Sequence, residues 1–215
     1  MADPVKRRYT SPRRAAQASR TRSAVLRAAR ELFLERGYAG AAVGDIASRA
    51  GVSVDTVYTA VGRKPQLMLA VIDQVLGSSD RPLPAGERAY VKAVRAAPTA
   101  EAKLRTYADA LGVLMPTVSP LFAALRESAS ADPECAALSE HIAQRRAANM
   151  RLLAAELRAT GRLRAELDDD HVADLIWSTN APEYYALVAS RGWTPREYAD
   201  RLFDLWSRVL LAHPV

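Results

Sequence analysis

The sequence predicts an all-α protein, with a short basic N-terminal domain and a larger helical C-terminal domain. Apolar residues recur at the three- and four-residue spacing of one helix face, as Leu26, Ala29 and Phe33 do. Proline, glycine and short polar residues mark the ends of these periodic segments. No segment alternates between apolar and polar residues over a useful length, so no β-sheet is expected.

The composition is that of a globular protein. Of its 215 residues, 49% are hydrophobic and 25% are charged, which is enough apolar content for a sizeable core. No apolar run approaches the ~20 residues that cross a bilayer, and the basic start lacks the apolar region of a signal peptide. Cys135 is the only cysteine, which excludes an intramolecular disulfide. We therefore expect a cytoplasmic protein with no membrane partner.

Positive charge is concentrated at the N-terminus. Residues 1–64 hold thirteen basic and five acidic side chains, a net charge of +8, whereas residues 65–215 carry −2. A basic segment joined to a near-neutral body indicates a polyanionic partner for that segment. The alternative is a tail that only improves solubility.

The chain divides into three predicted segments. Residues 1–18 are expected to form a disordered basic arm, because they combine prolines and little apolar content with five basic residues, Lys6, Arg7, Arg8, Arg13 and Arg14. Residues 19–64 are expected to form the first domain and residues 65–215 the second. The stretch 77–86, with two prolines, has the composition of a linker.

Prolines and glycines set the expected helix boundaries of the second domain. Pro116 is expected to end one helix and Pro120 to begin the next. A helix that begins at Pro133 should run until Gly161 stops it. Pro182 lies inside a helical pattern and should kink that helix. Thr194 and the residues after it form a capping box that begins the last helix.

Residues 41–67 have the pattern of two short helices joined by a sharp turn. Ile46 faces inward from the first helix, and Gly51 stands where the chain must take a positive φ, which glycine adopts without strain. Ser53 can cap the second helix, whose buried side is Val57. The pattern indicates a helix-turn-helix, for which the alternative is an ordinary helical hairpin.

The opposite face of the second short helix is left exposed. It presents Val54, Asp55, Tyr58 and Thr59 to solvent, with Thr56 at its edge. A polar stripe of this kind on the second helix is typical of a helix that enters the major groove of DNA.

The segment resembles the DNA-binding domain of the TetR family. The matching residues are Gly37, Tyr38, Asp45, Ile46, Ala47, Ala50, Gly51, Val52, Ser53, Thr56, Tyr58, Lys64 and Leu67. The resemblance implies that residues 54–59 form the recognition helix and that Tyr58 and Lys64 bind backbone phosphates. Phosphate contacts set the register on DNA, and base-edge contacts specify the sequence.

The sequence departs from the family pattern at three places. Ala41 and Ala42 stand where the family often has a threonine that caps the second helix and contacts a phosphate, so that contact is expected to be missing. Val61 replaces an aromatic residue. Asp55 adds a carboxylate to the exposed stripe, and it either accepts from a cytosine amino group or pairs with Arg49, which we slightly favour.

The C-terminal segment resembles the family less closely, from Trp177 to Tyr198. The resemblance implies a ligand-binding and dimerisation domain over residues 65–215, in which two C-terminal helices pair with those of a second copy. Its bundle should hold a mostly apolar ligand with one or two hydrogen-bonding ends. The candidate lining residues are Leu104, Tyr107, Leu111, Met115, Phe122, Arg126, Met150, Trp177, Asn180 and Tyr184.

Nothing in the sequence indicates an enzyme. The three histidines are scattered, and no metal-binding, nucleophile-elbow or phosphate-loop motif occurs. Cys135 near a helix start is better explained as an inert small side chain than as a reactive thiol. We expect no catalytic residues, metal or cofactor.

Two functions stay open. The first is a repressor that a small ligand releases from a palindromic operator, with the helix from Lys64 to Leu76 as the lever between the domains. The second is an architectural DNA-binding protein without an inducer, which would show little preference for one DNA sequence over another.

Overall fold

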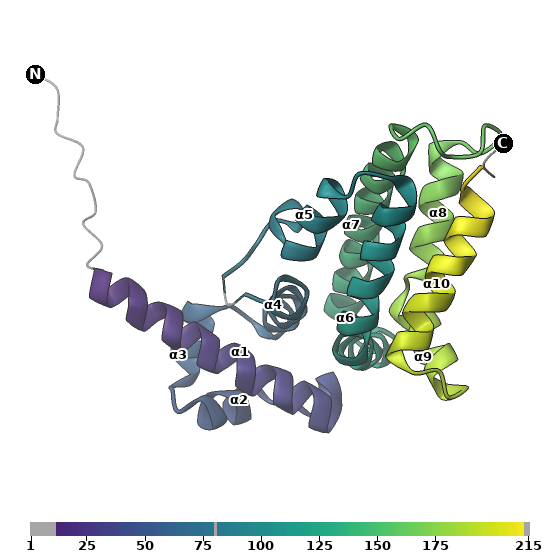
Figure 1. The fold of residues 1–215 in the computed structure, drawn as a ribbon. Coiled ribbons are helices and arrows are strands. Elements are labelled where there is room, and N and C mark those ends of the chain that lie inside the picture. The colour runs from purple at the N-terminus through teal and green to yellow at the C-terminus, as the bar shows by residue number, and fades with distance from the viewer. Residues whose placement is uncertain (1–11, 80, 213–215) are drawn as a thin grey trace, which may run out of the picture.

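The computed structural model describes residues 12–79 and 81–212 and confirms the all-α prediction (Figure 1). Within these residues no strand forms, and the only extended pairing is an isolated bridge between Leu163 and Leu211. The elements are α1 (Pro12–Gly40), α2 (Val43–Ala50), α3 (Val54–Ala60), α4 (Lys64–Gly77), the 3-10 turn η1 (Ala85–Glu87), α5 (Ala89–Ala96), α6 (Ala100–Ala129), α7 (Pro133–Arg158), α8 (Asp169–Thr179), α9 (Pro182–Ser190) and α10 (Pro195–Leu210).

The first helix begins earlier than expected. Residues 12–18 lie in α1, so the prediction of a disordered arm is wrong for them, and residues 1–11 lie outside the described residues. Arg13 and Arg14 are exposed on this first part of α1. Helix geometry is interrupted at Gly37, whose φ of 69° is not helical.

The prediction that Pro116 ends a helix and Pro120 begins another is wrong, because α6 runs through both prolines. Each proline lacks the N–H that would bond to the carbonyl one turn earlier, at a cost of about 3 kcal/mol. That cost is outweighed by burial, since α6 is the central helix of the C-terminal domain and packs against α5, α7, α9 and α10. The hydroxyl of Ser119 also donates to the carbonyl of Pro182 at 2.9 Å.

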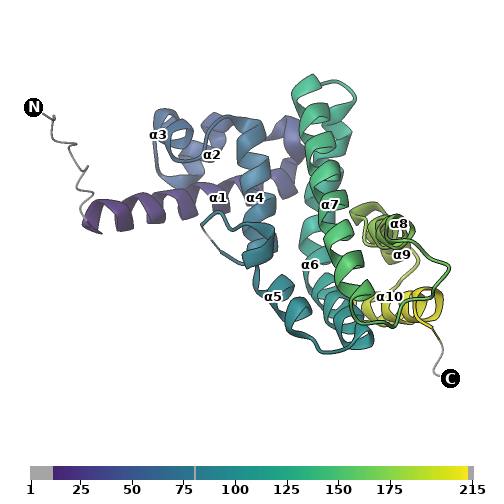
Figure 2. The same cartoon turned by 90° about the horizontal axis from the view of Figure 1, so that it is seen from above.

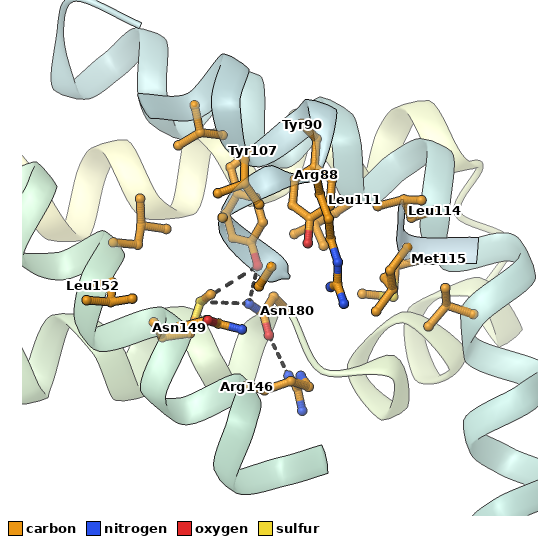
Figure 3. A pocket seen from close by; sticks show the side chains of 18 of the residues that line it. Arg88, Tyr90, Tyr107, Leu111, Leu114, Met115, Arg146, Asn149, Leu152 and Asn180 are labelled. Atoms are coloured by element: carbon orange, nitrogen blue, oxygen red, sulfur yellow. Dashed lines mark hydrogen bonds between the residues drawn. The ribbon is translucent and has the colours of Figure 1, made fainter. Parts of the chain in front are cut away.

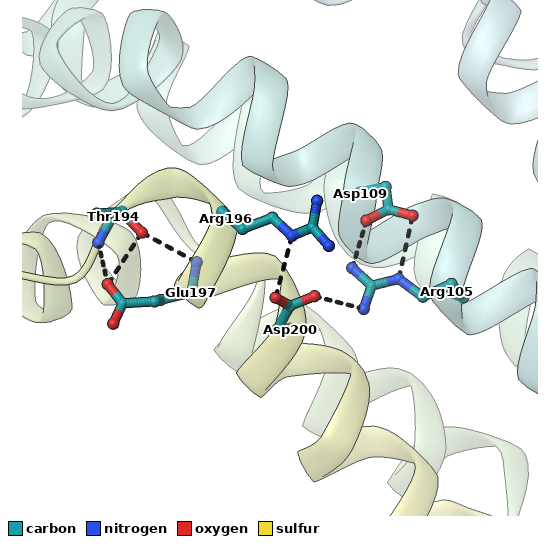
Figure 4. Close-up of polar contacts among 6 residues, drawn as sticks. All are labelled: Arg105, Asp109, Thr194, Arg196, Glu197 and Asp200. Carbon is teal, nitrogen blue, oxygen red and sulfur yellow. Dashed lines mark hydrogen bonds and ion pairs between the residues drawn. The ribbon is translucent and has the colours of Figure 1, made fainter.

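Two of the other predicted helix boundaries are confirmed, and the kink predicted at Pro182 is wrong. Asp132 caps α7, and Gly161 takes a φ of 70° just beyond its end. Thr194 and Glu197 form both bonds of the predicted capping box at the start of α10 (Figure 4). Pro182, expected to kink a helix, instead begins α9 after α8 has ended at Thr179.

Two hydrophobic cores hold the chain together. One is formed by α5–α10, with Trp206, Tyr198 and Leu104 fully buried. The other is formed by α1–α4 together with the C-terminal end of α6 and the first half of α7. Helix α4 thus packs with the first domain and against α6 and α7 of the second, as Figure 2 shows. The division at Lys64 stays a proposal.

Contrary to expectation, one helix reaches the length and apolar composition of a membrane span. An 18-residue window within α6 has a mean hydropathy of 1.5. Half of that window is buried by the surrounding helices, which is what the core helix of a folded bundle requires.

Helix α10 lies very close to α6 at Gly112. A Cβ atom at this position would stand 2.8 Å from the carbonyl oxygen of Pro195 and 3.1 Å from the Cβ of Ala199. Nearby, Arg105 of α6 pairs with Asp109 and, at 2.9 Å, with Asp200 of α10 (Figure 4). The small residue therefore allows the two helices to approach.

A Gly112→Ala substitution should lower the free energy of unfolding by about 1–3 kcal/mol, because the new methyl group meets backbone. Urea denaturation measures the change. Gly44→Ala, in α2 with open space around it, is the matched control and should be neutral or stabilising by about 1 kcal/mol. Equal effects at both sites would show that the α6–α10 approach is not tight.

Candidate DNA-binding surface and ligand pocket

The turn between α2 and α3 has the predicted geometry. Gly51 takes φ 68° and ψ 34° at the end of α2, and the next N–H, of Val52, donates to the carbonyl of Ala47 at 3.0 Å. The Ser53 hydroxyl then caps α3 by accepting from the N–H of Thr56 at 3.1 Å. Val57 is fully buried, and this fixes which face of α3 points outward.

The outward face of α3 is the stripe that the sequence predicts. Val54, Asp55, Tyr58 and Thr59 are exposed, with 47% of Tyr58 accessible, and Thr56 is half-buried. The Thr59 hydroxyl donates to the Asp55 carbonyl at 2.8 Å, so it is occupied within the helix. The exposed side chains of Val54, Asp55 and Tyr58 are therefore the ones available to a partner.

Asp55 does not pair with Arg49, so that interpretation is wrong. Arg49 instead bonds Glu35 at 2.7 Å and lies 3.9 Å from Glu31, both on α1. The reason is geometric, because Arg49 lies on the side of α2 that packs on α1. Among the described residues, no ion pair involves Asp55.

Lys64 begins α4 and lies against the end of α1. Its Nζ is 3.3 Å from the carbonyl oxygen of Ala39 and 4.5 Å from the centre of the Tyr38 ring. Partial burial lowers the pKa of this ammonium. The contact fixes the position of the lysine beside the helix-turn-helix. Ala42 precedes α2 and forms no side-chain cap, as its departure from the family pattern predicts.

Residues 25–71 match the family model described as "Bacterial regulatory proteins, tetR family". The match spans α2, α3, the turn between them and the parts of α1 and α4 that hold them. This segment is therefore a DNA-binding domain of the TetR family, which indicates a role in the regulation of transcription.

Solved structures of regulators share the fold over nearly the whole chain. A protein described as a TetR-family transcriptional regulator from Rhodococcus sp. matches with a TM-score of 0.68 at 18% identity, over 89% of this chain and 99% of that one. NalD from Pseudomonas aeruginosa gives 0.65 at 22% identity, over 92% and 100%. A regulator from Saccharomonospora viridis, solved with choline, gives 0.67 at 17%, over 89% and 98%. No curated protein sequence matches the chain.

The C-terminal domain contains a pocket between α5, α6 and α7, with a volume of about 140 Å³ (Figure 3). Six of the ten predicted ligand residues line it, so helical spacing located part of the wall. They are Tyr107, Leu111, Met115, Phe122, Met150 and Asn180.

The other four predicted residues lie outside the pocket wall. Leu104 is completely buried in the core, and Arg126 pairs with Glu183 at 2.6 Å. The ring of Trp177 lies under a guanidinium and its Nε1 donates to the Ala143 carbonyl at 3.4 Å. Tyr184 packs against Tyr198. Each of these four side chains packs or forms bonds within the fold and does not line the pocket.

One end of the pocket is polar. Asn180, only 2% exposed, donates through Nδ2 to the Tyr107 hydroxyl at 2.8 Å, and its Oδ1 accepts from the guanidinium of Arg146. Nη2 of Arg146, which donates to Asn180, also donates to the Trp177 carbonyl at 2.9 Å. Burial lowers the pKa of Arg146 and raises that of Tyr107.

Several wall residues were not predicted, notably Arg88, Tyr90, Arg146 and Asn149. A polar residue in a helical pattern is usually assigned to the solvent-exposed face, so sequence reasoning did not select these residues. For Arg146 a signal existed, because it continues the four-residue series of buried positions Leu138, Ile142 and Met150 on α7.

Arg88 connects the pocket wall to α4. Its side chain is 6% exposed and bonds the carboxylate of Asp73 on α4 at 2.9 Å. Arg145 of α7 binds the same carboxylate at 2.5 Å. Asp73 therefore joins the helix that follows the DNA-binding domain to Arg88 in the pocket wall and to Arg145 on α7. We call this group of three side chains the Asp73 clasp.

Replacing Lys64 by alanine should weaken binding to every DNA sequence and lower the slope of log affinity against log salt by about one, because one phosphate-bound cation is lost. Tyr58→Phe should weaken binding without changing that slope, since a hydroxyl releases no counterion. Binding titrations at several salt concentrations measure both. An unchanged slope for Lys64→Ala would reject the phosphate role of Lys64.

Asp55→Ala should change which base pairs are preferred, because the carboxylate has no ion pair among the described residues to keep it from a base. Selection of bound duplexes from a random pool, with wild type and variant in parallel, measures the preference. The same preferred sequence from both proteins would show that Asp55 does not contact a base.

Proposed function

We propose that the chain is a cytoplasmic, homodimeric repressor that a small ligand releases from a pseudo-palindromic operator. In this proposal α3 enters the major groove, where Val54, Asp55, Thr56 and Thr59 face base edges and Tyr58 and Lys64 hold phosphates. The observation that carries the proposal is the Asp73 clasp, because it links a pocket in one domain to the helix that follows the DNA-binding domain.

The dimer is proposed to form through two of the C-terminal helices α8, α9 and α10. These helices lie on the side of the molecule away from α1–α3 (Figure 1). Leu187 of α9 is 64% exposed, and Val209 of α10 is also exposed. A single α3 contacts too few base pairs to find one site in a genome, so two copies on two half-sites are needed.

Two structural relatives support a repressor with a ligand. NalD is described as the secondary repressor of the MexAB-OprM multidrug efflux pump. The regulator from Saccharomonospora viridis was solved in complex with choline. Neither description assigns a target or ligand to this chain.

The proposed lever is α4. It shares a core with α1–α3, packs on α6 and α7, and holds the Asp73 clasp at the pocket. A ligand changes operator affinity only if it binds one arrangement of this lever more tightly than the other. Movement of Arg88 on ligand binding would act directly on Asp73.

The repressor proposal is tested by deleting the coding sequence and following transcription of the neighbouring genes. The proposal is supported if deletion raises transcription and the wild-type chain lowers it again. A variant that lacks the exposed side chains of α3 should fail to lower it. Lower transcription on deletion would indicate an activator. Uniform small changes across the genome would favour the architectural alternative.

A further inference from the structure

Arg146 is a cation in the pocket wall without an acidic partner. Its hydrogen bonds go to the Asn180 side-chain oxygen and the Trp177 carbonyl, and its guanidinium lies 5.3 Å from the centre of the Trp177 ring. All three partners are uncharged. Within residues 12–79 and 81–212, no carboxylate lies at ion-pair distance from Arg146.

The other charged groups of the pocket wall are neutralised. Arg88 bonds Asp73, and Arg95 bonds Glu156 at 3.0 Å. Glu183 is near enough to act on Arg146 electrostatically, but its carboxylate is held by Arg126. Arg146 therefore contributes an uncompensated positive charge to the polar end of the pocket (Figure 3).

Arg146 is only partly accessible to water, and holding a partly buried charge is costly unless an anion joins it. The position of Arg146 on the buried series of α7 holds it there, between Ile142 and Met150. Both hydrogen bonds of the guanidinium use the same nitrogen, Nη2, so Nη1 and Nε have no hydrogen-bond partner among the described residues. Two donors of one planar group match the two oxygens of a carboxylate.

We propose that the pocket binds a small organic monocarboxylate, with its carboxylate on Arg146 and its apolar body against Leu111, Met115 and Met150. This inference rests on the proposed ligand-binding role of the pocket. The volume of about 140 Å³ is close to that of an engineered protein cavity that holds benzene, which limits the enclosed part of the ligand to a short chain or one ring. A cationic ligand would meet the charge of Arg146 unfavourably.

The test compares carboxylates with their uncharged primary amides on the full-length protein. The probes are butanoate, hexanoate, octanoate and phenylacetate, each with its amide, and the readouts are thermal stabilisation and calorimetric affinity. At least one carboxylate should bind about tenfold or more tightly than its amide, as expected for a hydrogen-bonded charge pair.

Arg146→Gln should remove the preference for the carboxylate over its amide. Arg146→Lys, which keeps the positive charge, should retain part of that preference. Arg151→Gln is the matched control, because Arg151 lies on the same helix outside the pocket wall in an exposed ion pair with Asp170, and it should keep the preference. The inference is overturned if no carboxylate binds more tightly than its amide, or if the preference survives in Arg146→Gln. A merely structural role would lower carboxylate and amide binding alike, which also overturns it.

Operator release is measured with the same probes, so that the two proposals fail separately. Carboxylate binding that depends on Arg146 but leaves operator affinity unchanged supports this inference and contradicts ligand release. Release by the amides as readily as by the carboxylates supports ligand release and contradicts this inference.

Discussion

An Asp73→Asn variant is expected to lose about 2–3 kcal/mol of folding free energy and most of its response to ligand. The substitution keeps the shape of the side chain but removes the charge that Arg88 and Arg145 share. Removing one partner of a buried ion pair leaves the other charge uncompensated, and Arg88 is nearly inaccessible to water. The loss should be smaller than for a fully buried pair because Asp73 is partly exposed.

Urea denaturation measures the stability change, and the ratio of operator affinities with and without ligand measures the coupling. Asp204→Asn is the matched control, since Asp204 pairs with Arg208 on an exposed face of α10 and such pairs contribute at most about 1 kcal/mol. A variant at Asp73 that is as stable and as responsive as this control would show that the clasp does not connect the domains.

Replacing Asn180 by alanine should abolish the ligand response and leave operator affinity without ligand intact. Asn180 is nearly inaccessible and joins Tyr107, Arg146 and Met150 at the polar end of the pocket. Its loss leaves a buried hydroxyl and a buried guanidinium short of a partner, at a cost of about 1–3 kcal/mol. The assays are calorimetric binding of the best carboxylate probe and operator titrations below the unfolding temperature.

Tyr107→Phe is the comparison variant. It removes the hydroxyl that receives the Asn180 bond but keeps the ring, which stacks 5.8 Å from Trp206 and 6.3 Å from Tyr90. Tyr107→Ala would also empty this part of the core, at about 3–5 kcal/mol, and could not separate binding from folding. Equal loss of ligand and operator binding in Asn180→Ala would show that Asn180 is structural.

The DNA-binding surface could be predicted from the sequence because its determinants are local. Gly51, Ser53 and Val57 fix the turn, the cap and the buried side of α3, and the exposed stripe follows from them. The partner of Arg49 could not be predicted, because it depends on how α1 crosses α2. The roles of the stripe residues on DNA remain predictions.

The C-terminal domain shows where local signals fail. Two prolines predict a break, yet α6 continues because its packing against six other helices outweighs two missing hydrogen bonds. Spacing located part of the apolar wall of the pocket. Arg88 reaches the pocket from the segment before α5, where no helical periodicity indicates it. The charge balance of Arg146 depends on which carboxylates other arginines occupy, and only the folded chain decides that.

The central claim, that two copies of the chain recognise one specific DNA site, is tested most directly by selecting bound duplexes from a random pool and determining the stoichiometry on the enriched sequence. The account predicts two inverted half-sites whose centres lie about one helical turn apart or slightly more. It also predicts two chains per duplex and a preference of ~10³-fold or more over bulk DNA. Enrichment of one unrepeated half-site bound by a single chain, or no enrichment at all, would contradict it.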